Sequence, residues 1–519
     1  MPLNLVSFPP QDKSQALYLQ IANWIEQNIT ENRLLPGDQL PTVRVLAQFL
    51  GVNRGSIASA YKHLSNTGVL LAHVGKGTFV NAAAARSTET ETGSSGQLFW
   101  EPLLAEAATR IGLGKPAMAN IGRDTIWVPD RGEASEPDTQ ISMDMPLANH
   151  HLGYALIRKT LREITDELPV DTLAYNHPQG MHSLRVQLTE LARHQNLLLS
   201  PQQIMICNGA QQALSLLSSL LIRPGDTVIT EDPSYPGATR AFRMAGAKII
   251  GIPVDDGGMR VDVLDGILRN HQPKLIYTVP SFHAPTGTTL NIERRLHLYR
   301  LAQKHQVPIL EDEYVNSLYY GEPPPDPIKS LDRSGLVAYI GTFSKTLGAS
   351  MRLGWIAAHP DLIARLVQVK ELHDIHSSIF SQLIAERLLL EGSYLTHLDE
   401  LRQHYRLLYH TLLGKLTHHT KLTIQKNTYH GGFSVWVALP NEITASDWLV
   451  YARARGVTFD LGKPYFLGGG SDQYARLCFS LLSISDINNA ADILQESLVE
   501  ALAKQSRHTT RRDRFLPFS

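Results

Sequence analysis

Hydrophobic residues in the first 80 positions recur with the period of a helix. Five of them fall on one helical face: Leu17, Ile21, Trp24, Ile25 and Ile29. A Leu-Pro-Gly-Asp turn at residues 35–38 ends this segment, and a second helical pattern starts after the Pro-Thr pair at 41–42. Residues 51–53 form a tight turn, and Asn53 is a suitable N-cap for a third helix. The pattern predicts three helices, the last two arranged as a helix-turn-helix.

Strand-like patterns follow these helices. Residues 69–73 and 78–80 predict two short strands around the Val-Gly-Lys-Gly segment at 74–77, that is, a hairpin. Three helices and a hairpin in this order form a winged helix, which we place at residues 12–80. Residues 1–80 hold six Lys or Arg and four Asp or Glu, a balance of +2, which is weak support for a nucleic-acid surface.

Short apolar strands alternate with amphipathic helices from about residue 145 to residue 390. The clearest strand patterns lie at residues 204–207, 227–230, 275–279, 307–310 and 337–340. This rhythm predicts an α/β fold with a mostly parallel sheet and helices on both faces.

Beyond residue 395 the pattern changes to that of a smaller α+β subdomain at about 395–505. A long helix at 394–416 precedes strands at 433–439 and 476–479. The predicted division of the chain is the winged helix at 12–80, a linker at 81–140, a larger domain at 141–505 and a basic tail at 506–519.

The composition is that of an ordinary globular protein, with 43% hydrophobic and 19% charged residues. The net charge is −1, so any nucleic-acid site has to be local. Cys207 and Cys478 are the two cysteines and neither has a CxxC neighbour, so we expect no metal site and no disulfide framework. No signal-peptide pattern and no apolar stretch of ~18 residues occur, so we expect a cytoplasmic protein without a membrane segment.

A lysine in a hydroxyl-rich turn follows the predicted strand at 337–340. Thr342 and Ser344 precede Lys345, and Arg352 stands seven residues further on. A lysine here can condense with an aldehyde cofactor, and the arginine can bind its phosphate. This run resembles the lysine segment of the fold-type-I pyridoxal-phosphate (PLP) enzymes, the aspartate aminotransferase superfamily. The alternative role for the lysine is a solvated surface residue.

A carboxylate is the second part that PLP needs, because an anion keeps the ring nitrogen protonated. Asp312, after the predicted strand at 307–310, is the candidate. Glu311 and Glu313 compete for the role, but strand alternation puts them on the opposite face. Tyr314 shares the face of Asp312 and is the candidate donor to the ring hydroxyl. The alternative is an acidic strand-end loop with no ligand.

A glycine turn after the predicted strand at 204–207 is the candidate phosphate cup. Gly209 allows close approach, and Ala210 and Gln211 open a helix whose backbone N–H groups bind anions. By the resemblance, the two hydroxyl residues and the arginine of the lysine run complete the cup. Tyr235 follows another strand and is the candidate to stack on the ring; its alternative role is a core aromatic.

Arg476 stands at the start of the predicted strand at 476–479. A planar guanidinium binds a carboxylate bidentately. In the superfamily an arginine in this setting holds the substrate carboxylate, so the resemblance implies that role for Arg476. The alternative is an arginine in a structural salt bridge.

The two parts together resemble the MocR-type subfamily of GntR regulators, which joins a GntR winged helix to an aminotransferase-like domain. Three further segments carry this resemblance: Leu-Pro-Gly-Asp-Gln-Leu-Pro at 35–41, Gly-Lys-Gly-Thr at 75–78 and Tyr-Asn-His-Pro-Gln-Gly at 175–180. The resemblance implies binding to double-stranded operator DNA through Arg44, Asn53, Arg54, Ser56 and Lys76. It also implies a domain-swapped homodimer, in which the winged helix of one chain (its DNA reader) lies over the aminotransferase-like domain of the partner.

Two departures limit the resemblance. Ala284 stands where aminotransferases usually carry the asparagine that bonds the ring hydroxyl, so Tyr314 does that work alone or His283 substitutes. Residues 141–154 lack the usual Gly-x-Pro pattern near the substrate pocket.

The leading hypothesis is a PLP-dependent transcriptional regulator in which an amino acid or amine effector displaces Lys345 from the cofactor. It is not expected to be a physiological enzyme, although slow transaminase activity is compatible with the residues present. Two alternatives stay open: an active aminotransferase that carries a DNA reader, and a regulator that senses PLP itself.

Overall fold

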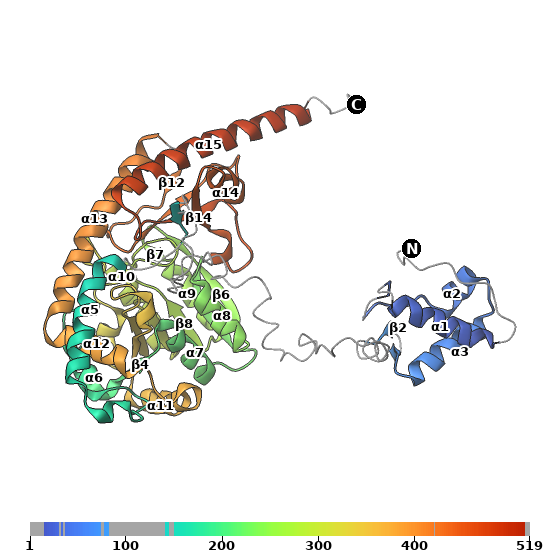
Figure 1. The fold of residues 1–519 in the computed structure, drawn as a ribbon, viewed down its shortest axis with the longest axis horizontal. Helices are drawn as coiled ribbons and strands as arrows, with labels where there is room; N and C mark the ends of the chain where they lie inside the picture. Colours follow the sequence, from blue (N-terminus) through green and yellow to red (C-terminus); the bar gives the residue numbers. More distant parts are fainter. Residues whose placement is uncertain are drawn as a thin grey trace. The chain divides into compact units, whose positions relative to one another are not determined.

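The computed structural model describes residues 15–30, 33–34, 37–73, 77–81, 141–144, 150–419 and 421–513. The chain forms two compact units, residues 1–103 and 104–519, which are the blue and the teal-to-red parts of Figure 1. Apart from Asn81, the predicted linker at 81–140 lies outside the described residues.

Three helices and a hairpin make up the first unit: α1 (Leu17–Thr30), α2 (Val43–Leu50), α3 (Arg54–Asn66), β1 (Leu70–His73) and β2 (Gly77–Val80). The predicted apolar face of α1 packs into its core. Thr42 caps α2, and the Asn53 side chain caps α3 by accepting the Ser56 backbone N–H at 2.8 Å. Between these helices Gly51 has a φ of +66°, which side chains with a Cβ rarely adopt. The predicted winged helix is confirmed.

An eight-stranded sheet organises the second unit, in the order β4-β11-β10-β9-β8-β5-β6-β7. Its strands are β4 (Ile204–Cys207), β5 (Thr227–Asp232), β6 (Lys248–Asp255), β7 (Gly258–Met259), β8 (Leu275–Thr278), β9 (Ile309–Asp312), β10 (Val337–Thr342) and β11 (Gly354–Ala357). Neighbours from β10 to β6 in this order are parallel. The expected mostly parallel sheet is therefore confirmed. β11 adds a strand to those predicted and runs antiparallel to both β10 and β4.

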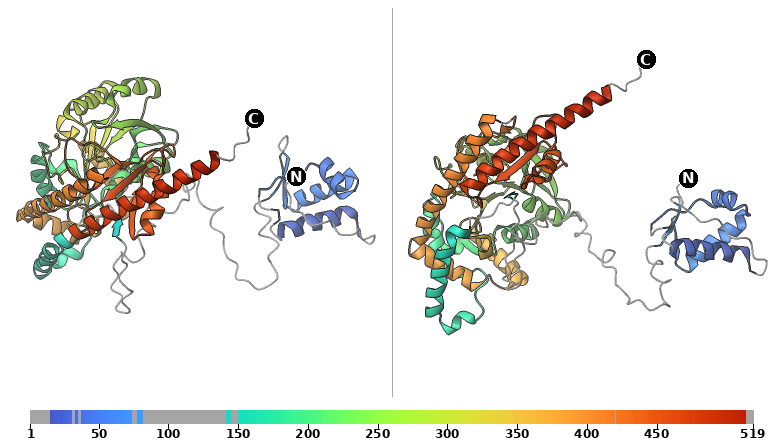
Figure 2. Two further views of the ribbon diagram at one scale, coloured as in Figure 1. Left: turned by 90° about the horizontal axis from the view of Figure 1, so that it is seen from above. Right: turned by 45° about the horizontal axis from the view of Figure 1, so that its top comes forward.

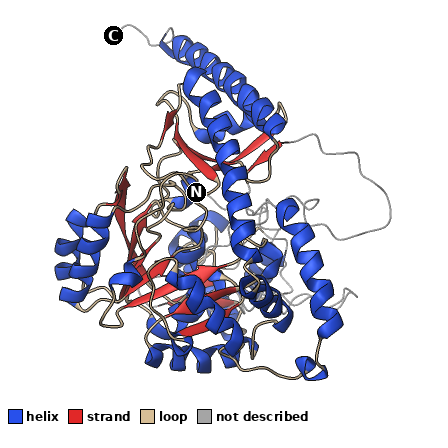
Figure 3. Ribbon diagram, turned by 90° about the vertical axis from the view of Figure 1, so that its left-hand side faces the viewer, coloured by secondary structure: helices blue, strands red, loops and turns tan. Residues whose placement is uncertain are grey.

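Helices cover both faces of this sheet, as the alternating pattern predicts (Figure 3). One face carries α7 (Ala210–Leu221), α8 (Pro236–Met244) and α11 (Pro360–Asp374). The other carries α6 (His182–Arg193), α9 (Leu264–His271), α10 (Ile292–His305) and α12 (Ile379–Leu390), with α5 (His150–Glu167) against α12. Strand residues alternate between these layers: Ile340 joins the first core and Tyr339 the second.

A smaller sheet has the order β12-β13-β15-β14-β3. Its elements are β3 (Ile141–Met143), β12 (Thr423–Ile424), β13 (Ser434–Ala438), β14 (Val457–Leu461) and β15 (Tyr474–Cys478), with helices α13 (Ser393–His419), α14 (Ala445–Arg453) and α15 (Ile484–Asp513). β3 pairs in parallel with β14, so the smaller subdomain includes residues far ahead of the predicted 395–505. α15, the long red helix in both views of Figure 2, extends into the predicted tail at 506–519. Among the described helices, none is long and apolar enough to cross a membrane.

Replacing Gly354 with Ala should destabilise the second unit. A Cβ here would lie 2.8 Å from the Gly341 carbonyl oxygen and 3.1 Å from the backbone of Gly209, and backbone atoms cannot move aside as a flexible side chain does. We expect the free energy of unfolding to fall by about 1–3 kcal/mol in denaturant titrations. Gly266→Ala in α9 is the control, because nothing lies within 4 Å of its added Cβ. Equal losses in the two variants would contradict the steric explanation.

Candidate functional site

Three loops meet at the carboxyl ends of the parallel strands. β9 ends at Asp312, which is paired in register with Ile340 of β10. β10 leads into the turn that carries Lys345, and β4 leads into the glycine turn before α7. β11 is antiparallel to both β10 and β4, so β4 and β10 run in the same direction. The predicted residues therefore gather at one edge of the sheet, where open α/β sheets bind ligands.

Asp312 is buried and has one oxygen without a hydrogen-bond partner among the described residues. Its Oδ2 accepts the Tyr277 hydroxyl at 2.9 Å, whereas Oδ1 has no donor. Burial raises the pKa of Asp312 to about 7, against the opposing effects of Tyr277 and Lys345. A protonated ring nitrogen would supply the missing donor and a positive charge. The residues present therefore fit the ring of PLP.

The two neighbouring acids are engaged elsewhere, as strand alternation predicts. Glu311 accepts the backbone N–H groups of Ile328 and Lys329. Glu313 accepts the Ser281 hydroxyl at 2.8 Å and pairs with the buried Arg295. Both acids are thus held in structural networks, and Asp312 is the one that faces the site.

Lys345 is half-buried in the turn after β10. Burial and then the positive charge of Arg476 lower its pKa to about 8, with a smaller effect of Arg352 in the same direction. Its Nζ lies 5.7 Å from the centre of the Phe433 ring. An amine with this pKa is partly neutral near pH 7 and can act as a nucleophile.

The turn that the sequence predicts as the phosphate site lies around Gly209, which has a φ of +88° and precedes α7. Arg352 Nη2 donates to the Asn208 carbonyl oxygen at 2.9 Å, and a Cβ on Gly209 would lie 3.0 Å from that nitrogen. The backbone N–H groups of Ala210 and Gln211 make no hydrogen bond within the described part of the chain. An oxyanion could accept these amides beside the exposed guanidinium.

The two hydroxyl residues of the lysine loop already shape the turn. Thr342 Oγ1 donates to the Leu353 carbonyl oxygen at 3.0 Å and accepts the Ser344 backbone N–H at 3.1 Å. Their contact with a phosphate stays a prediction.

Asp374 at the end of α11 is a supporting residue that the sequence did not reveal. Its Oδ2 accepts the side-chain amides of Asn208 at 2.6 Å and Gln212 at 2.7 Å, and Lys370 pairs with it at 2.6 Å. Asp374 thereby holds the turn on both sides of Gly209. It lies more than 160 residues from that turn, in no local motif, so only the fold brings it there.

Two tyrosines lie near the acid and the glycine turn. The Tyr235 hydroxyl donates to Gln211 Oε1 at 3.3 Å. The Tyr314 hydroxyl donates to the Phe282 carbonyl oxygen at 3.1 Å. Their predicted contacts with a cofactor ring stay predictions. His283 is buried, and its Nδ1 bonds Thr286 Oγ1.

Arg476 on β15 is already in an ion pair. Its Nη2 lies 2.7 Å from Asp460 Oδ2 on the neighbouring β14, and its guanidinium lies 5.0 Å from the centre of the Tyr465 ring. The predicted binding of an effector carboxylate therefore meets a carboxylate that is already present. Asp460 was not among the predicted residues. Its contact with Arg476 depends on the register between β14 and β15, which no local sequence pattern gives.

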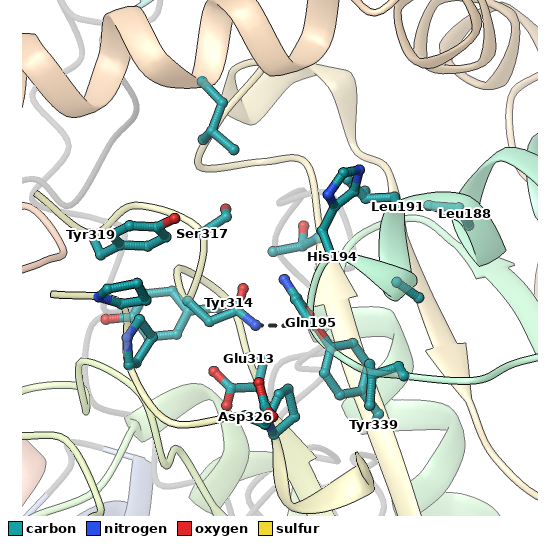
Figure 4. A pocket seen from close by; sticks show the side chains of 18 of the residues that line it. Leu188, Leu191, His194, Gln195, Glu313, Tyr314, Ser317, Tyr319, Asp326 and Tyr339 are labelled. Atoms are coloured by element: carbon teal, nitrogen blue, oxygen red, sulfur yellow. Dashed lines mark hydrogen bonds between the residues drawn. The ribbon is translucent and has the colours of Figure 1, made fainter.

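A separate cavity of about 260 Å³ lies between α6, the start of α13 and the segment after β9 (Figure 4). Tyr314 and Tyr339 line it, and the Tyr339 hydroxyl donates to Gln195 Oε1 at 3.1 Å. Neither Lys345 nor Asp312 lines it. It is therefore not the candidate cofactor site, although Tyr314 and Thr342 belong to both.

In the first unit, three of the predicted DNA contacts are exposed: Arg44 on α2, Asn53 before α3 and Arg54 on α3. Asn53 also caps α3, so its side-chain oxygen has a structural role. Ser56 is half-buried, and Lys76 lies outside the described residues. The DNA contacts of all five stay predictions.

Comparisons with known proteins identify both units. Residues 145–494 match the family "aminotransferase class I and II", and residues 17–80 match "bacterial regulatory proteins, gntR family". The chain belongs to the aminotransferase class I and II family and carries a GntR-type DNA-binding domain, which is the MocR-type architecture of a transcriptional regulator.

The chain is similar over nearly its whole length to two regulators. It is 29% identical over 484 residues to the uncharacterized HTH-type transcriptional regulator YdfD of Bacillus subtilis, covering 93% of this chain and 96% of YdfD. It is 29% identical over 479 residues to the HTH-type transcriptional regulator TauR of Rhodobacter capsulatus, covering 92% and 94%.

Two solved aminotransferases share the fold of the second unit. LysN, the α-aminoadipate aminotransferase of Thermus thermophilus, has a TM-score of 0.71 at 27% identity over 78% of this chain and 100% of its own, and contains N-(5'-phosphopyridoxyl)-L-leucine. The kynurenine aminotransferase of Pyrococcus horikoshii, in complex with PMP, has a TM-score of 0.67 at 30% identity over 74% and 99%. The family and these complexes identify the cofactor as PLP.

The lowered pKa of Lys345 predicts how cofactor uptake depends on pH. A neutral amine attacks an aldehyde and a protonated one does not. With a pKa of about 8, the neutral form dominates above that pH and is lost below it. The rate at which the apoprotein binds added PLP, followed by visible absorbance, should rise with pH around a midpoint near 8. A midpoint near the ordinary lysine value of 10.5 would contradict the proposed environment.

Proposed function

We propose that this regulator binds PLP on Lys345 and senses an amino acid or amine through that cofactor. The observation that carries the proposal is Asp312, a buried carboxylate with one unpaired oxygen, gathered with Lys345 at the same edge of the sheet. The same chain carries a DNA-binding winged helix, so ligand binding has an evident output.

When bound, PLP supplies an aldehyde that condenses reversibly with primary amines and a ring that withdraws electrons. In the proposal, Lys345 Nζ would hold the aldehyde, and Asp312 Oδ1 would accept a hydrogen bond from the protonated ring nitrogen. Tyr235 stacks on the ring, and Tyr314 donates to the ring hydroxyl. The phosphate is bound by Gly209, Ala210, Gln211, Thr342, Ser344 and Arg352.

An effector would act through its amine, which would compete with Lys345 Nζ for the aldehyde that the cofactor supplies. Lys345 Nζ would then be released as an amine, and this exchange of one amine for another involves no oxidation or reduction. The effector changes DNA binding only if it has different affinities for two conformations of the chain. Lys345 belongs to the large sheet's loops and Arg476 to the small sheet, so a ligand that contacts both connects the two subdomains.

We further propose a homodimer built on an exposed apolar surface of the second unit. Val170, Leu173 and Tyr175 are 84%, 76% and 85% exposed, and Leu372 is 89% exposed. The Tyr175 ring meets the His376 ring edge-on at 6.1 Å, so these two segments are adjacent. An apolar surface of this kind indicates a protein interface. The linker at 81–140 gives a DNA reader the length to lie over the partner's body, and the proposed place of action is the cytoplasm.

Likeness to aminotransferases supports a second candidate, transamination by this site. An aromatic-amino-acid aminotransferase of Thermococcus litoralis is 33% identical over 356 residues. Steady product formation with a keto-acid acceptor would favour this candidate. A regulator that senses PLP itself would instead change its DNA affinity with PLP in the absence of any amine.

Lys345→Ala should abolish the effector response and keep DNA binding. Without Lys345 the effector amine has nothing to displace, so the change in operator affinity, typically about 5- to 150-fold for coupled sites, should vanish. Electrophoretic mobility shifts with and without amines measure it. Lys415→Ala is the control, because Lys415 is a surface residue paired with Asp492. A response that persists in Lys345→Ala would refute the displacement.

Arg54→Ala should weaken operator binding and leave PLP uptake unchanged. Arg54 is exposed on the first turn of α3, and losing a base contact costs about 1–3 kcal/mol. Lys62→Ala removes an equal charge two turns further along α3 and serves as the control. Equal losses in the two variants, measured by fluorescence anisotropy, would show that charge and not placement matters.

A further inference from the structure

The ion pair between Asp460 and Arg476 is built into the small sheet. The two residues face each other in the register of β14 and β15. Asp460 Oδ2 accepts both Arg476 Nη2 at 2.7 Å and the Tyr465 hydroxyl at 2.6 Å. Two charge-assisted or short contacts on one oxygen hold this carboxylate against the guanidinium.

A second carboxylate lies near the same groups. Asp144 follows β3, the parallel neighbour of β14, and its Oδ2 accepts the Thr458 hydroxyl at 3.3 Å. Burial raises the pKa of Cys478 to about 12; Asp460 and Asp144 add to the rise, whereas Arg476 and Lys345 oppose it. Cys478 is thus within electrostatic reach of both acids and of Lys345. Thr458 and Asp460 lie on the same face of β14, so Asp144 is a second acid on the face that carries the ion pair.

The accessible polar group of this ion pair is the acid and not the arginine. The Arg476 side chain is 8% exposed and its Nε is buried without a partner among the described residues, whereas the Asp460 side chain is 28% exposed. An incoming carboxylate would have to displace Asp460 and would then lie beside two anions. An incoming ammonium group meets Asp460 Oδ1, which makes no hydrogen bond in the described part of the chain.

We propose that Asp460 selects effectors that carry a second cationic group, namely diamines, over amino acids of the same length. The effector's reactive amine goes to the cofactor and its distal ammonium goes to Asp460. This inference rests on the proposed function, since it assumes that an amine effector acts at Lys345.

Matched pairs of amines test the selection in the full-length protein loaded with PLP. Putrescine is compared with γ-aminobutyrate, and cadaverine with δ-aminovalerate, because each pair differs only in an ammonium or a carboxylate at the far end. The readouts are the visible absorbance of the bound cofactor and the affinity for promoter DNA. We expect each diamine to half-saturate the absorbance change at a concentration about tenfold or more below that of its amino acid partner.

Asp460→Asn separates charge from shape. It keeps the side chain's size but leaves Arg476 without its anion, so the preference should move towards the two amino acids by about tenfold or more. Asp492→Asn, which removes a surface carboxylate paired with Lys415, should keep the wild-type preference. Unchanged melting temperature and cofactor content exclude misfolding as the cause.

The outcomes distinguish the two levels of the proposal. An equal response to both members of a pair, or a wild-type preference for the amino acids, overturns the selection by Asp460 and leaves the proposed function standing. A preference that Asp460→Asn does not alter also overturns it. No absorbance change with the four amines but a change with α-amino acids also overturns the selection alone. No change with any of these compounds refutes the amine-sensing function, and the selection falls with it.

Discussion

The end of β9 carries three buried acids, and they differ in what holds them. Glu313 and Asp312 each keep one oxygen without a donor in the described part of the chain, but Glu313 is paired with the buried Arg295, whereas Asp312 has only a tyrosine hydroxyl. Glu311 and Glu313 are held by backbone amides, a hydroxyl and Arg295. Asp312, on the opposite face, has Tyr277 on one oxygen and nothing on the other. An unpaired buried polar atom costs about 1–3 kcal/mol. The fold tolerates this cost at a point where a cationic ring nitrogen can remove it.

Local sequence patterns predict the elements well, because periodicity and caps act over a few residues. The strand predicted at 204–207 is β4 residue for residue, and Asn53 caps α3 as its position indicates. Pairings across long separations are not encoded in such patterns. β11 has four residues and no turn signal of its own, and β3 has three, so each depends on a distant strand for its existence. Asp374 and Asp460 escape prediction for the same reason.

The phosphate end and the effector end of the candidate site differ in how readily they can bind an anion. The phosphate end offers the helix amides after Gly209 and an exposed Arg352, without a competing carboxylate in the described contacts of that arginine. The effector end offers Arg476 with Asp460 already on it. Transamination uses an amino acid and a keto acid, and both need a carboxylate handle. Here the arginine that would bind this carboxylate is already paired with Asp460. The arrangement therefore favours a site that binds and keeps one amine ligand over a site that exchanges an amino acid for a keto acid, and this suits a regulator.

Backbone pairing within the small sheet also connects Asp460, at the effector end of the site, to the strand that follows the predicted linker. Asp460 lies on β14, β14 pairs with β3, and β3 begins at Ile141, directly after the predicted linker at 81–140. If ligand binding moved β14, the three paired positions would carry that movement to β3, the first described strand after the predicted linker. This contiguity is the geometric condition for coupling. The thermodynamic condition is a difference in effector affinity between two arrangements of the small sheet, because a ligand that binds both equally shifts neither.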